Sequence, residues 1–286
     1  MKIGLWLLAA ALTVVCFVFQ NRTGPTYPLR GAFATARGPV TFEFLRSEHI
    51  GTGLQVMLKE PVPAGVSGKV RFRRFKSHDE WRELPMAPGT FRFTRRGAVD
   101  EIKGAGAVLP SLPERAGKYE YFVLLDDGGG FRSVTGERPV FARYKAEVPL
   151  FILLPHIFMV FFSMMMAMRT ALEALRGGEV KRLLAATVGS LLVGAFVLGP
   201  LVQKHAFGVY WSGFPYGYDW TDNKVVVELF GWLLAGAVAL FVKDGRKTRA
   251  AVLLATVVTL AVYFIPHSIF GSEYDYTRGA GHGTAG

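Results

Sequence analysis

The sequence contains little cysteine and comparatively little acid. Cys16 is the only cysteine among 286 residues, so the chain forms no internal disulfide and each folded part must be held together by its own core. The 33 Lys and Arg residues outnumber the 22 Asp and Glu residues, which gives a net charge of +11 at pH 7. The His-x-x-Glu-His spacing of zinc proteases is also missing. No motif names a reaction, so the sequence favours a protein that is not an enzyme but leaves the question open.

Long apolar runs, in contrast, are abundant. Five of them occur, at residues 3–19, 148–168, 183–203, 225–242 and 250–270. Each is close to the ~20 residues with which a helix crosses a hydrocarbon core ~30 Å thick. The first run is not followed by the small residues of a signal-peptidase site, so we expect a retained anchor at residues 1–22. The other four runs predict a four-helix transmembrane bundle at residues 148–270.

The positive charges of the short connections predict the orientation of these spans. The residues between the third and fourth runs balance Lys204 and Lys224 against Asp219 and Asp222. The connections after the second and fourth runs are strongly cationic, with Arg169, Arg176, Lys181, Arg182, Lys243, Arg246, Lys247 and Arg249. Cationic loops stay in the cytoplasm. We therefore predict a bacterial inner-membrane protein with a cytoplasmic N terminus, in which residues 30–146 and the tail 271–286 lie outside the cell membrane.

The polar segment at residues 30–146 has the pattern of an antiparallel β-sandwich. Short alternating segments occur between Pro and Gly turns, at residues 40–44, 54–58, 69–75, 90–94, 119–125 and 140–144. Six or seven such strands over about 100 residues fit a domain of immunoglobulin or fibronectin type III character, with Trp81 between the sheets. Domains of this kind usually bind or space other proteins, so we expect a membrane or periplasmic protein partner.

The most basic segment of this domain is residues 71–76. Its mixture of arginine and phenylalanine resembles a surface that binds single-stranded nucleic acid. However, Val70 and Phe72 alternate with Arg71 and Arg73, which is typical of a strand with one solvated face. We therefore expect no nucleic acid. An anionic partner is compatible with the 21 Lys and Arg against 14 Asp and Glu of residues 20–147.

Two similar phrases place a histidine directly after a proline inside an apolar run, at His156 and at His267. An ionisable ring is costly in a membrane and is therefore a candidate for function. Both histidines are predicted to lie near the exterior face, and Glu228 adds a carboxylate from the fourth run. His156 and His267 could ligate haem b axially. Together with Glu228 they could instead bind a transition metal such as iron, zinc or manganese.

Further polar residues are predicted to share this layer with the histidines. This polar rim comprises His205, Asp219, Asp222, Asn223, Lys224, Ser268, Glu273 and Asp275. Local roles account for several of them: Thr221 or Asp222 can cap the fourth span, and Lys224 can pair with Glu228 four residues later.

The loop at residues 211–224, the strand at residues 73–75 and the tail at residues 267–276 resemble segments of bacterial multi-span membrane proteins of unassigned function. The resemblance implies the order of anchor, extracytoplasmic immunoglobulin-like domain and four-span bundle. It also implies a tyrosine at the position of His205, which argues against that residue as a ligand. It brings no activity with it.

Three functions remain open. The first is an accessory, assembly or sensing protein whose exterior domain docks a partner. The second is a membrane-embedded protein that binds a metal or haem through His156 and His267. The third is a membrane-embedded hydrolase or transferase in which a histidine acts as general base.

Overall fold

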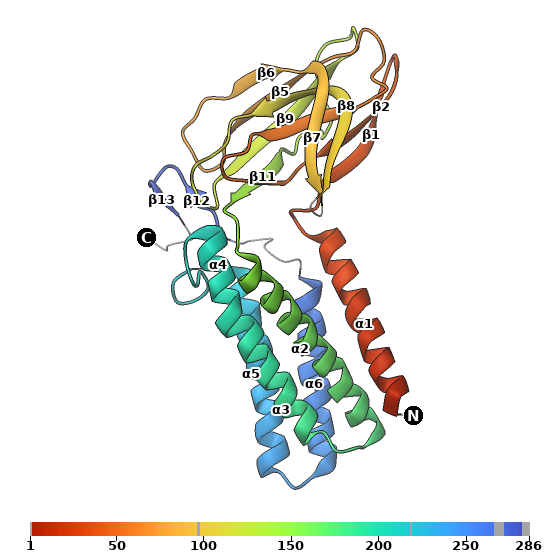
Figure 1. Cartoon of the computed structure of the whole chain (residues 1–286), viewed down its shortest axis with the longest axis vertical. Helices are drawn as coiled ribbons and strands as arrows, with labels where there is room; N and C mark the ends of the chain where they lie inside the picture. The colour runs from red at the N-terminus through yellow and green to blue at the C-terminus, as the bar shows by residue number, and fades with distance from the viewer. Residues whose placement is uncertain (1, 96–97, 218, 266–271, 282–286) are drawn as a thin grey trace. The chain divides into compact units, whose positions relative to one another are not determined.

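The computed structural model describes residues 2–95, 98–217, 219–265 and 272–281. The chain folds into two units, shown in Figure 1. Of the described residues, the helical unit contains those up to 25 and those of 148–272, and the β domain contains those of 26–147 together with the tail 273–281. The chain therefore returns to the β domain after its last helix.

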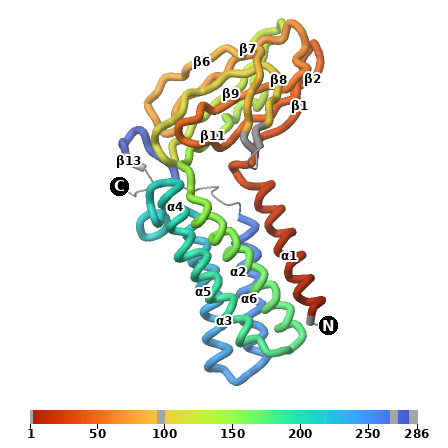
Figure 2. Tube along the Cα trace, in the orientation of Figure 1, coloured from red at the N-terminus to blue at the C-terminus, as the bar shows by residue number. Residues whose placement is uncertain are grey.

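The helical unit contains five helices that are long and apolar enough to cross a membrane, which confirms the predicted number of spans and places this unit in a lipid bilayer. The first two are α1 (Lys2–Thr23) and α2 (Leu150–Arg176). The third span consists of three consecutive segments, α3 (Lys181–Leu191), the π-helical η1 (Leu192–Leu198) and α4 (Gly199–Phe207). The last two are α5 (Trp220–Phe241) and α6 (Gly245–Phe264). Helices α2 and α5 each pack against α3 and α6, and α1 packs against α2 and α6 (Figure 2).

The second span is longer than the sequence analysis predicted. Arg169 lies inside α2 and not in the connection that follows it. Its buried guanidinium pairs with Glu173 at 2.6 Å and lies 5.3 Å from the ring of Trp6 on α1. This pairing one helical turn along α2 allows a cation to remain in an apolar helix. The helix ends only at Gly177, which adopts a left-handed conformation with φ 75°.

The β domain is built from two large sheets, and its tail adds a two-stranded sheet of β12 (Tyr274–Asp275) and β13 (Ala280–Gly281). The first has the strand order β1 (Leu29–Thr35), β2 (Gly38–Phe44), β4 (Leu54–Lys59), β8 (Ala98–Leu109) and β7 (Ala87–Arg95). The second has the order β3 (Ser47–His49), β11 (Val140–Lys145), β9 (Lys118–Asp126), β5 (Ser67–Arg74) and β6 (Arg82–Pro85), with β10 (Arg132–Ser133) paired to β9. All of these pairings are antiparallel except β3 with β11.

Both sheets contribute side chains to one hydrophobic core. Its fully buried members include Val40, Phe44, Leu54, Val56, Leu58, Leu109, Val70, Tyr121, Val123, Leu125, Ala142 and Tyr144. On β5, Val70 and Phe72 are buried in this core while Arg71 and Arg73 face outward, as the alternation predicted.

Among the longer strands, the sequence analysis did not predict β1 or β8, and β8 is rich in glycine and alanine. A Cβ atom at Gly106 would lie 2.6 Å from the carbonyl oxygen of Val56 on the paired strand β4, and Gly104 faces Leu58 in the same way. Glycine is therefore required where β8 approaches β4. Because glycine also weakens the sequence pattern of a strand, this element could not be recognised.

Trp81 was expected between the sheets, and this prediction is wrong. Trp81 lies outside the core, where its ring contacts Phe122 of β9 at 5.6 Å between centroids. The guanidinium groups of Arg71 and Arg73 lie 5.1 Å and 4.5 Å from the same ring. The indole thus packs on the outward face of the second sheet, where cations can stack on it.

Candidate functional site

His156 is positioned by an irregularity in the third span. It follows Pro155 in α2, is half-buried, and its Nδ1 donates to the carbonyl oxygen of Gly194 at 2.9 Å. Gly194 belongs to the π-helical segment η1 and lies so close to α2 that a Cβ atom there would be 3.1 Å from the backbone of Met159 and Val160. Since a carbonyl can only accept, Nδ1 carries the proton and Nε2 of the neutral ring holds the lone pair. No residue that the structure describes hydrogen-bonds to Nε2.

The partners proposed for His156 are only in part within the described residues. His267 and Ser268 lie outside them, so the paired histidines and the set of two histidines with a carboxylate remain predictions. Within the described ranges, no three His, Cys, Asp or Glu side chains come together as a metal site. Glu228 is buried in α5, where it interacts with Thr259 and with the charge of Lys224. Lys224 in turn donates to the carbonyl oxygen of Ile265 at 2.8 Å.

Two residues of the predicted polar rim, Asp219 and Asp222, share a buried cluster with Ser212 and Ser272. Asp222 accepts from the backbone N–H groups of Ser212 and Gly213 at 2.7 and 3.0 Å. Asp219 accepts from the N–H of Ser272 at 2.8 Å, and the two serine hydroxyls lie 2.8 Å apart. Because backbone amides occupy both carboxylates, the cluster fastens the loop before α5 and does not present a free base.

The N-cap of α5 differs from the prediction. Asp219, not Thr221 or Asp222, caps the helix, since its Oδ1 accepts from the N–H of Thr221 at 2.8 Å. Asn223 accepts from the N–H of Phe214 at 2.7 Å and so supports the same loop. His205 lies half-buried in the last turn of α4. The contacts of Asp219 and Asn223 therefore stabilise the loop that precedes α5.

The remaining two rim residues, Glu273 and Asp275, contact the β domain. Glu273 forms ion pairs with Lys118, at 2.5 Å, and with Lys76. Burial and, after it, the charge of Arg143 lower the pKa of Lys118, Glu273 opposes both effects, and the resulting pKa is about 8. Burial alone would raise the pKa of Glu273, but the two lysines outweigh it and hold that pKa below its usual value. Asp275 accepts from Thr277 within the tail and lies 3.8 Å from Arg278.

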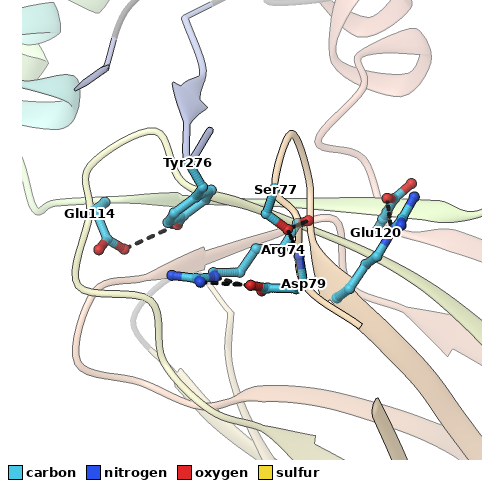
Figure 3. Close-up of polar contacts among 7 residues, drawn as sticks. Arg74, Ser77, Asp79, Glu114, Glu120 and Tyr276 are labelled. Atoms are coloured by element: carbon cyan, nitrogen blue, oxygen red, sulfur yellow. Dashed lines mark hydrogen bonds and ion pairs between the residues drawn. The ribbon is translucent and has the colours of Figure 1, made fainter. Parts of the chain in front are cut away.

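Tyr276 completes the attachment of the tail. Its hydroxyl donates to Glu114 at 3.0 Å, and the guanidinium of Arg74 lies 4.5 Å from the centre of its ring (Figure 3). Arg74 is held in this position by two hydrogen bonds of 2.6 and 2.7 Å to Asp79 (Figure 3). The Arg74 hydrogen bonds hold the pKa of Asp79 below its ordinary value. The β domain therefore holds the tail in two ways. Arg74 stacks on the ring of Tyr276, and Lys118 and Lys76 pair with the carboxylate of Glu273.

The backbone that receives the tail is strained. Lys76 and Ala116 have φ angles of 53° and 63°, in the left-handed region that non-glycine residues rarely adopt. The carbonyl oxygen of Lys76 accepts from the N–H of Tyr276 at 2.9 Å, and that of Ala116 accepts from the N–H of Tyr274 at 3.0 Å. Such conformations cost about 1–3 kcal/mol each and persist where the surroundings hold them, often at binding sites. The loops around these residues thus form a receptor for an acidic and aromatic segment.

The outward face of the second sheet carries a second cationic and aromatic surface, which we call the Arg–Trp face and define as Arg71, Arg73, Trp81 and Phe122. Arg73 is paired with Glu120 at 2.6 Å, but no described carboxylate pairs with the exposed Arg71. Trp81 and Phe122 are half-buried. Arginine and tryptophan are enriched among the residues that dominate binding energy at protein interfaces.

Comparison with known protein families, with curated proteins and with solved structures found no match. Functional conclusions must therefore come from the geometry.

Proposed function

We propose that this chain is an integral membrane accessory, assembly or sensing protein whose β domain docks a partner protein with an acidic surface through the Arg–Trp face. The observation that carries the proposal is the exposed Arg71, which stacks on Trp81 and forms no ion pair within the described part of the chain. Glu83 lies opposite Arg71 on β6 but pairs with Lys69, so the guanidinium of Arg71 can be offered to a partner, while the indole supplies apolar contact area.

The tail supports the same chemistry. Through Lys118, Lys76 and Arg74 the β domain already binds an acidic and aromatic segment of its own chain. A partner with carboxylates beside aromatic side chains would find similar groups on the Arg–Trp face.

We infer further that the β domain is a sandwich of immunoglobulin or fibronectin type III character. The strand order supports this, because β2, β4, β8 and β7 follow the order A-B-E-D of such a domain and β5, β9 and β11 follow C-F-G. The cationic connections support a cytoplasmic N terminus and an exterior β domain in a bacterial inner membrane.

Photo-crosslinking in native membranes tests the docking proposal. A benzophenone amino acid at position 122 of the full-length protein should give one discrete product with a protein whose surface is acidic, and Arg71→Glu should abolish that product. The same probe at position 92, an exposed site in the first sheet, is the control. The same product from both positions, or a product that persists in Arg71→Glu, would refute docking through this face.

A specific observation also favours the second candidate, a haem or metal protein. Histidine ligands usually donate the other ring nitrogen to a backbone carbonyl or a carboxylate, and the bond from His156 Nδ1 to Gly194 has this form. An optical spectrum and elemental analysis of the purified protein test the idea. A Soret band or one equivalent of metal that is lost in His156→Ala but retained in His205→Phe would establish the site, and neither signal in the wild-type protein would exclude it.

A further inference from the structure

A groove runs between α3 and α5 in the helical unit. It has a volume of about 540 Å³, its lining is mainly apolar, and Lys181 is the charged residue of that lining. Along α3 it is bordered by Lys181, Ala185 and Gly189, whose spacing of four residues places them on one face of the helix. Gly236 and Ala237 border it on α5.

The small residues leave this space open. A Cβ atom at Gly189 would meet no atom within 4 Å, and one at Gly236 would lie 3.3 Å from Leu184. Small residues in membrane helices usually serve close packing against another helix. Here none of the described helices covers Gly189, so the groove is available to a molecule from the bilayer.

The dimensions of the groove match a lipid chain better than a helix. From Lys181 to Gly189 the helix rises about 12 Å, which is less than half of a hydrocarbon core about 30 Å thick. The groove therefore lies within one leaflet. A helix that crosses the bilayer would extend well beyond this groove, whereas an acyl chain stays within one leaflet.

The charge at the end of the groove indicates which lipid it takes. Lys181 begins α3, directly after the turn at residues 177–180, and Arg182 follows it. Basic pockets between membrane helices on the cytoplasmic side bind anionic headgroups. We propose that the groove binds one anionic phospholipid, with its headgroup at Lys181 and an acyl chain between α3 and α5. This site does not depend on docking by the β domain.

Native mass spectrometry of the full-length protein tests the proposal, with dioleoyl phosphatidylglycerol and dioleoyl phosphatidylcholine as probes. One phosphatidylglycerol should be retained in preference to phosphatidylcholine, by about fivefold for one interfacial charge. Lys181→Gln should remove the preference, whereas Lys247→Gln, which changes a cation at the same end of the bundle outside the groove, should keep it. Equal retention of both lipids by the wild-type protein would overturn the proposal.

A second variant tests the acyl chain. Gly189→Leu adds a side chain in the groove at a position where a Cβ atom meets nothing within 4 Å, and it should reduce retention of both lipids severalfold. Gly4→Leu is the matched control, because a Cβ atom at that glycine in α1 also meets nothing within 4 Å. Unchanged retention in both Gly189→Leu and Lys181→Gln would place the lipid elsewhere and overturn the proposal. A change of oligomeric mass in Gly189→Leu alone would show that the groove is an interface between protein chains, and this result would also overturn the proposal.

Discussion

The helical unit is held together by buried polar side chains, whereas the β domain has both buried ones, such as Glu43 and Asp127, and ion pairs at its surface. In the helical unit, the indole N–H of Trp232 donates to the hydroxyl of Thr259 at 2.8 Å, and Asp222 accepts buried backbone amides. In the β domain, pairs such as Lys69 with Glu83 lie at the surface. A polar group without a partner is expensive in a bilayer but nearly free in water. Polar residues of the helical unit therefore hold the unit together, whereas those on the β domain surface are available for recognition.

The largest effect is expected at Asp222. Asp222→Ala leaves the buried N–H groups of Ser212 and Gly213 without an acceptor and should lower the free energy of unfolding by about 3 kcal/mol. The exposed pair provides the contrast, because Glu83→Ala should cost about 0.5 kcal/mol or less. Denaturant titration in detergent measures both. Equal losses in the two variants would contradict the difference between the units.

Tyr276 tests whether the tail is held as an interface. Tyr276→Ala removes both the stacking on Arg74 and the hydrogen bond to Glu114, and local opening of the tail should become easier by about 2 kcal/mol. Hydrogen exchange of the backbone amides of Tyr276 and Thr277 should then be about 30-fold faster. Tyr276→Phe, which keeps the ring, should have a smaller effect. Unaltered exchange in Tyr276→Ala would show that the side chain does not hold the tail.

A double-mutant cycle in the helical unit should show a smaller coupling. Trp232→Phe and Thr259→Val each remove one partner of a buried hydrogen bond between α5 and α6. Such bonds in membranes contribute about 0.6 kcal/mol on average and up to about 1.7 kcal/mol. We expect a coupling energy of about 1 kcal/mol from the four unfolding free energies, and strict additivity would argue against the bond.

Lys118 supplies the pH dependence of the tail. Because its pKa of about 8 lies below the ordinary value of 10.5, the charged form is disfavoured in the folded domain. This destabilisation of the folded domain is present in full below about pH 8 and is relieved as the pH rises towards 10.5. Over the same rise Lys118 loses its charge, so its ion pair with Glu273 is lost.

NMR titration of the Lys118 side chain measures this pKa directly. Glu273→Gln removes the charge that raises it and should shift the midpoint below 8. Arg143→Gln removes a charge that lowers it and should shift the midpoint upwards. The same midpoint in the wild-type protein and in both variants would contradict the assigned causes.

The sequence predicted the spans better than their ends. Twenty apolar residues in a row identify a membrane helix, but the extension of α2 through Arg169 depends on Trp6 and Glu173, and the contact with Trp6 is made by another helix. Alternation likewise predicted β5 and β9, whereas β8 forms because its glycines fit against β4.

The candidate sites were predictable only in part. Asp219 and Asp222 were singled out from the sequence, but the pattern did not reveal that they contact Ser212 and Ser272. The attachment of the tail depends on backbone carbonyls of Lys76 and Ala116, which are far away in the sequence. Similarly, the bond from His156 to Gly194 requires a π-helical segment that no pattern of side chains reveals.

The most direct measurement compares stability and crosslinking in a single variant of the Arg–Trp face. Arg71→Glu should lower the free energy of unfolding by no more than about 1 kcal/mol, because Arg71 is exposed and the variant loses only the stacking on Trp81 and places a glutamate opposite Glu83. The same variant should reduce the crosslinked product from position 122 at least tenfold. A large loss of stability would show that Arg71 serves the fold, and undiminished crosslinking would show that it does not serve recognition.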